Sequence, residues 1–65
     1  MNATKKFFVT KLQSSKDNTK TFPVLQCDLG YRVITVSFDT AVIAEVSGLT
    51  FENIYNLKVN ERIDL

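Results

Sequence analysis

The sequence predicts a mainly β protein with three strands, a helical insertion and one or two further strands. Three segments rich in aromatic and β-branched residues occupy the first half of the chain, and polar or glycine-containing turns separate them. A stretch with helical apolar spacing follows at residues 40–47. The 65 residues should form one domain, residues 1–65, because a chain this short builds a single core.

The first three strands are expected at residues 5–12, 21–29 and 32–38. Strand alternation places Phe7 and Phe8 on opposite faces, so one ring faces the core and the other does not. Leu12 shares the face of Phe8 and favours Phe8 as the inward ring. Cys27 alternates with Leu25 and is expected to be an inert buried thiol, since free cysteine packs as a small hydrophobe.

The second half of the chain should hold the helix and the closing strand. Asp39 is placed to cap a helix over residues 40–47, and Gly48 is placed to end it. Thr50 is a candidate cap for a further helical turn over residues 51–55. Residues 57–65 are expected to form the closing strand.

Charge divides the chain into two halves. Residues 1–32 carry six basic and two acidic side chains, a net charge of +4, whereas residues 33–65 carry two basic and five acidic ones, a net charge of −3. The overall charge of +1 hides this division. A basic β surface with aromatic side chains nearby is typical of proteins that bind a polyanion.

The composition argues against catalysis. The chain has no histidine, and its carboxylates are scattered singly. Cys27 is the only cysteine, so it has no imidazole to activate it and no partner for a disulfide or a zinc site. We therefore expect no enzyme activity and no metal or other cofactor. No apolar run has the length of a membrane span, and the single thiol fits a reducing cytoplasm.

The candidate binding residues are basic and aromatic. Five basic residues would hold phosphates: Lys6, Lys11, Lys16, Lys20 and Arg32. Tyr31 and Phe7 are the candidate stacking residues, and Tyr31 is preferred because it adjoins the turn at Gly30, where a ring can stand in solvent. The alternative is that the lysines form an ordinary solvated face and the aromatic rings belong to the core.

A resemblance to a known family supports nucleic-acid binding. Three strands, a helix and a closing hairpin follow the order of the OB-fold, a small barrel that commonly binds oligonucleotides. The stretch QCDLGYRVITV at residues 26–36 resembles the central hairpin of small phage and plasmid single-stranded-DNA-binding proteins, including the filamentous-phage type. This resemblance implies a small OB-like five-stranded barrel with one short helix between strands 3 and 4. It also implies that the protein binds single strands without sequence preference and works as a homodimer. A chain of this size without disulfide or metal also favours self-association.

The expected function is thus non-sequence-specific binding of single-stranded DNA by a cytoplasmic homodimer in a phage or plasmid setting. The alternative is a small protein-interaction module that uses its acidic half or an open strand edge. Four apolar residues of the second half would serve such a module, although barrel closure explains them more simply: Leu49, Phe51, Ile54 and Tyr55.

Overall fold

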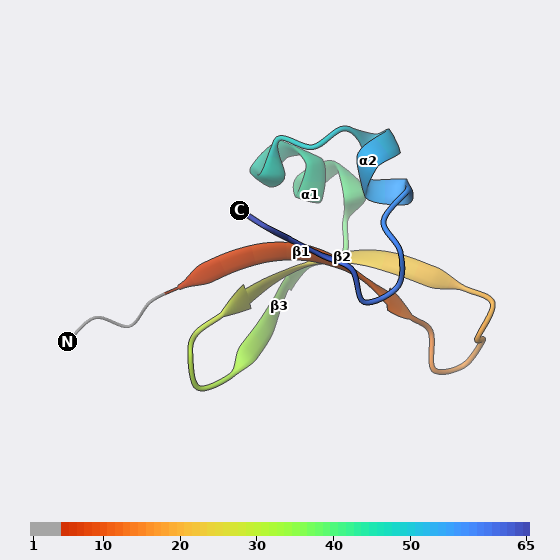
Figure 1. The fold of residues 1–65 in the computed structure, drawn as a ribbon, viewed down its shortest axis with the longest axis horizontal. Helices are drawn as coiled ribbons and strands as arrows, with labels where there is room; N and C mark the ends of the chain where they lie inside the picture. The colour runs from red at the N-terminus through yellow and green to blue at the C-terminus, as the bar shows by residue number, and fades with distance from the viewer. Residues whose placement is uncertain (1–4) are drawn as a thin grey trace.

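A computed structural model describes residues 5–65, in which four strands form one antiparallel sheet (Figure 1). The strands are β1 (Lys6–Gln13), β2 (Thr21–Asp28), β3 (Val33–Ser37) and β4 (Arg62–Asp64), and their spatial order is β3-β2-β1-β4. Two helices separate β3 from β4: α1 (Thr40–Ser47) and α2 (Phe51–Tyr55). Both helices lie on the same face of the sheet. Neither is long and apolar enough to cross a membrane.

The mainly β class is confirmed, but the closed five-stranded barrel and the single helix are wrong. The sheet of residues 5–65 has four strands and two open edges, β3 and β4. The difference arises after Leu57, which is buried in the core. The next residues form a turn in which Glu61 N–H donates to the Lys58 carbonyl and Asn60 adopts a φ of 68°. Strand pairing resumes only over the three residues of β4, and no closing hairpin forms among the described residues.

Both helices begin and end where the sequence predicts. The Asp39 carboxylate accepts a hydrogen bond from Ala41 N–H and caps α1. Gly48 ends α1 in the left-handed conformation, with a φ of 76° that favours glycine. The Thr50 hydroxyl accepts a hydrogen bond from Asn53 N–H, so the predicted further turn is the separate helix α2.

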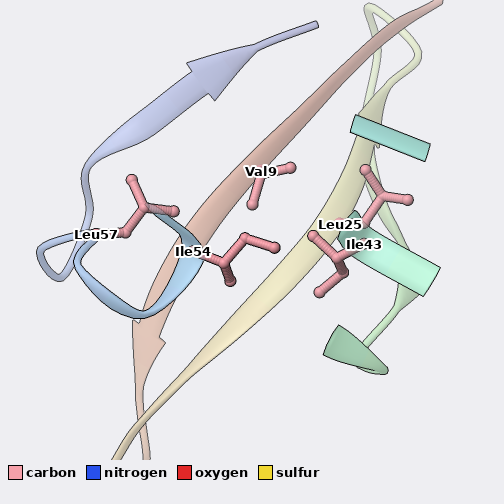
Figure 2. Packing of buried hydrophobic residues seen from close by; sticks show 5 residues of the cluster. All are labelled: Val9, Leu25, Ile43, Ile54 and Leu57. Atoms are coloured by element: carbon pink, nitrogen blue, oxygen red, sulfur yellow. The ribbon is translucent and has the colours of Figure 1, made fainter. Parts of the chain in front are cut away.

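The core lies between the helices and the sheet (Figure 2). Its members come from β1, β2, both helices and the segment after α2: Val9, Leu25, Ile43, Ile54 and Leu57. In the register of the sheet, Val9 stands opposite Leu25 in the β1–β2 ladder and opposite Ile63 in the β1–β4 ladder. Cross-strand partners project to the same side, so all three face the helices. This side is the covered face of the sheet.

The other side of the sheet, which carries no helix, is the open face. Phe8 projects there, opposite Gln26 on β2 and Asp64 on β4. Its ring is only 5% exposed, whereas Phe7 on the covered face is 40% exposed. The prediction that Phe8 is the buried ring is confirmed, although it does not face the helices. Cys27 is also buried, as predicted.

Candidate nucleic-acid interface

The structure separates the seven predicted site residues into three groups. Four lie near one end of the sheet, at the start of β1 and in the turn between β2 and β3: Lys6, Phe7, Tyr31 and Arg32. Two lie in the loop that joins β1 to β2 at the opposite end: Lys16 and Lys20. Lys11 lies in the interior of β1.

The β2–β3 turn holds Tyr31 away from the rest of the molecule. Leu29 N–H donates to the Arg32 carbonyl at 2.8 Å, which leaves Gly30 and Tyr31 as the two residues at the tip. Gly30 has a φ of 94°, a conformation that side chains disfavour, and its N–H donates to the Asp28 carboxylate at 2.8 Å. Tyr31 follows with a side chain that is 81% exposed. The turn therefore presents an aromatic ring to solvent on a defined backbone.

Lys6 and Phe7 join this turn through the β1–β2 ladder. Lys6 stands opposite Asp28 and Phe7 stands opposite Cys27, so both lie within a few residues of the turn. Both side chains and that of Arg32 are exposed. Strand alternation places Lys6 on the open face and Phe7 on the covered face, so the two side chains flank this end of the sheet. We call Lys6, Phe7, Tyr31 and Arg32 the turn-end surface.

The loop at the far end of the hairpin carries Lys16 and Lys20, both exposed. Lys20 N–H donates to the Asp17 carbonyl at 3.0 Å, which closes the loop. The hydroxyl and backbone N–H of Thr19 donate to the Asp17 carboxylate and lower the pKa of Asp17 below its usual value. The ionised carboxylate offsets part of the positive charge of the two lysines. The eight residues of β2 separate this loop from the turn-end surface by about 26 Å, at about 3.3 Å per residue.

Lys11 does not join either group. It projects to the covered face opposite Pro23 and is 8% exposed. Its Nζ donates a hydrogen bond to the backbone carbonyl of Tyr55, the last residue of α2. A cation at the carboxyl end of a helix is favoured by the helix dipole. Lys11 therefore ties α2 to the sheet, and its buried ammonium is less accessible to a phosphate than that of an exposed lysine; its phosphate-binding role stays a prediction.

Arg62 is a basic residue of the open face that the sequence reasoning missed. Its guanidinium carbon lies 3.8 Å from the centroid of the Phe8 ring, and its Nε donates to the Asp64 carboxylate at 2.7 Å. The Arg62 guanidinium stacks on the Phe8 ring and shields it from solvent. The Arg62 side chain itself remains 42% exposed. Strand alternation in residues 57–65 could have placed Arg62 and Asp64 on one face, but it could not identify Phe8 as their neighbour.

The other basic side chains of the interface are free of ion pairs. Within residues 5–65 the one salt bridge joins Arg62 to Asp64, so four exposed cations have no carboxylate oxygen within 4.0 Å: Lys6, Lys16, Lys20 and Arg32. They lie at both ends of the β1–β2 hairpin rather than in one cluster. The arrangement fits an extended polyanion better than a compact one.

Two aromatic residues predicted to close the core are exposed instead. Phe51 and Tyr55 lie one helical turn apart on α2, and their rings make an edge contact with centroids 6.4 Å apart. Each is at least half exposed, whereas Ile54 between them is fully buried. Of the four apolar residues that the sequence assigned to the core, Ile54 and the half-buried Leu49 do pack there.

Comparison with known proteins adds no relative. No protein-family model, no curated protein and no solved structure matches this chain.

Proposed function

We propose that this protein binds single-stranded nucleic acid, with DNA as the expected form, without sequence specificity. The observation that carries the proposal is the 81% exposed ring of Tyr31, held at a tight turn beside Arg32 and close to Lys6. A ring this exposed contributes little to the core, so the interpretation of Tyr31 as a core aromatic does not account for it. An exposed ring beside cations suits base stacking with phosphate contact on either side.

The spacing of the free cations supports an extended ligand. The turn-end surface and the loop lysines are separated by about 26 Å along β2. A flexible single strand can follow this length. Side chains that neutralise phosphates carry no base information, so binding is expected to tolerate any sequence. The resemblance of residues 26–36 to the hairpin of phage and plasmid single-strand-binding proteins supports the same ligand and such a setting.

The proposal is tested by fluorescence anisotropy with labelled oligo-dT at low salt. Four phosphate contacts from the exposed cations predict a log-log slope of binding against salt near −3 for a single strand, at about 0.7 per contact. Absence of binding at tens of micromolar protein would refute the proposal. An equally sized duplex and an RNA strand in the same titration measure the preference for single strands and for DNA.

Tyr31→Ala should weaken oligo-dT binding by about 1–3 kcal/mol, the contribution of one stacked base, and leave the melting temperature unchanged. The matched control is Tyr55→Ala, which removes an exposed tyrosine from the covered side of the molecule and retains the carbonyl bound by Lys11. Equal binding by both variants would remove Tyr31 from the interface. A large loss of stability in Tyr31→Ala would instead show that the ring stabilises the fold.

A second candidate function is a protein-interaction module, which the exposed pair of Phe51 and Tyr55 favours. Aromatic residues are enriched in the centres of protein interfaces, and Glu52 adds an acidic side chain to the same helix. Protein complexes that survive nuclease and high salt, and that Phe51→Ala abolishes, would favour this function.

A further inference from the structure

The two edges of the sheet are protected very differently. The β4 edge is three residues long and has a charged side chain on either side of Ile63, namely Arg62 and Asp64. The β3 edge has no charged residue from Val33 to Phe38. Charges and short length are the usual means of keeping an edge strand from pairing with another chain. The β3 edge lacks the charges and exposes the side chains of Val33, Val36 and Phe38.

The backbone of β3 offers hydrogen-bonding groups along this edge. Leu29 and Arg32 form a hydrogen-bonded pair at the turn. Residues of an antiparallel ladder alternate between facing the partner strand and facing away from it, so Ile34 bonds toward β2 opposite Cys27. The N–H and C=O groups of Val33 and Thr35 therefore point outward. The bulge opposite Leu25 and Gln26 interrupts the regular ladder after Thr35.

We propose that β3 pairs with β3 of a second copy of this chain, antiparallel, with the two-fold axis at Ile34. This register places Val33 opposite Thr35 of the second copy and Thr35 opposite its Val33. In this register the N–H and C=O groups of Val33 and Thr35, all four of which point outward, form hydrogen bonds with the second copy. The two four-stranded sheets then form one continuous eight-stranded sheet.

Charge and symmetry favour a second copy as the occupant. A two-fold interface is self-complementary, and an uncharged segment meets its own copy without like-charge repulsion. The nearest cation, Arg32, would lie opposite Val36 of the second copy. The two Arg32 residues would be offset by four residues, about 13 Å along the strands at 3.3 Å each, which exceeds the Debye length of about 10 Å at 0.1 M salt.

Molecular mass in solution tests the pairing without nucleic acid, and its outcome is therefore independent of the proposed function. Sedimentation equilibrium of the full chain at tens to hundreds of micromolar should give twice the 7.4 kDa of one chain. Val33→Lys puts two like charges beside the axis and should give a monomer. The matched control Val59→Lys changes an exposed valine away from β3 and should remain a dimer.

Thr35→Pro is a second variant with a different mechanism. Proline removes an N–H that points outward, so it blocks pairing with a second copy and spares the β2–β3 ladder. It should also give a monomer, with the wild-type circular dichroism spectrum. A wild-type monomer across this range, or a dimer that survives in folded Val33→Lys, would overturn the proposal.

A disulfide tests the register itself. Ile34 would lie opposite its own copy in a non-hydrogen-bonded pair, where Cα atoms are about 4.5 Å apart and a disulfide can form. Ile34→Cys should therefore cross-link into a covalent dimer on mild oxidation, in a Cys27→Ala background that removes its neighbour on β2. Thr35→Cys in the same background would be two residues out of register with its copy and should not cross-link. Efficient cross-linking of Thr35→Cys instead of Ile34→Cys would reject this register.

Discussion

The two faces of the sheet achieve burial by different means. On the covered face, aliphatic side chains of β1 and β2 pack against Ile43 and Ile54 from the helices (Figure 2). On the open face, the ring of Phe8 is shielded by the guanidinium of Arg62, which arrives from the neighbouring strand. The covered face is closed by a second layer of chain, and the open face is shielded at Phe8 from within the sheet.

The covered face provides folding free energy, and the open face keeps a charged side chain accessible to solvent. Apolar burial between two layers provides most of the folding free energy of a small domain. A cation on a ring contributes less, but it keeps a positive charge at the surface. We therefore expect substitutions of the buried side chains on the covered face to unfold the chain, and substitutions of exposed side chains on the open face, such as Arg62, to alter its surface with little loss of structure. Val24, which is fully buried on the open face opposite Thr10, is expected to behave like the residues of the covered face.

The largest expected effect is at Ile43, which is fully buried on the covered face. Ile43→Ala should lower the free energy of unfolding by about 2–5 kcal/mol through lost transfer energy and a cavity. A core of this size supplies only about 3–5 kcal/mol, so the substitution should remove most of the stability of the fold. Urea denaturation followed by circular dichroism measures this.

The control for Ile43 is its neighbour on α1, Val42, which is exposed. Val42→Ala should change the free energy of unfolding by less than about 0.5 kcal/mol. Similar losses in the two variants would contradict the assignment of the covered face as the main core.

An intermediate effect is expected at Lys11, the one cation of the covered face. Lys11→Met keeps an apolar stem but leaves the Tyr55 carbonyl without its charged donor. The expected loss is about 1–3 kcal/mol, seen as a lower urea midpoint. Lys20→Met, in the exposed loop, removes the same charge and should have no effect on stability. Equal midpoints for the two variants would show that Lys11 does not anchor α2.

The smallest effect is expected on the open face. Arg62→Gln removes the cation above Phe8 and its exposed pair with Asp64, and should cost about 0.5–1 kcal/mol. That corresponds to a fall in melting temperature of about 2–8 °C for a domain of this size. Lys58→Gln makes the same charge change at another exposed position and is the reference. A loss from Arg62→Gln comparable to that from Ile43→Ala would erase the distinction between the faces.

The local elements could be predicted from the sequence because their signals are local. Alternating β-branched residues identified β3, and the caps at Asp39 and Thr50 identified the starts of both helices. The shared face of Phe8 and Leu12 favoured Phe8 over Phe7 as the buried phenylalanine, and the structure decided between them. The exposed turn tyrosine followed from Gly30, because a two-residue turn with a positive φ leaves the next side chain at its tip.

What the sequence did not show concerns residues whose environment comes from distant segments. Lys11 was predicted to hold phosphate together with the other basic residues of the first half, and its burial under the end of α2 could not be predicted from neighbouring residues. Arg62 was counted with the acidic half, although it stacks on Phe8, which is 54 positions earlier in the chain. The predicted closing strand over residues 57–65 is shortened to the three residues of β4, because Leu57 packs into the core and a turn between Lys58 and Glu61 follows it.

The sequence by itself determined the three main strands, the two capped helices and the division of charge, since each depends on propensity, alternation or capping within about ten residues. Only the tertiary structure decided which lysine is buried, which face the helices cover, and that the sheet is open at β3 and β4. These features depend on contacts between residues far apart in sequence. The physical reason is that a local pattern does not distinguish the two faces or the two edges of a strand. Packing against distant segments determines which face is covered and which edge is left open.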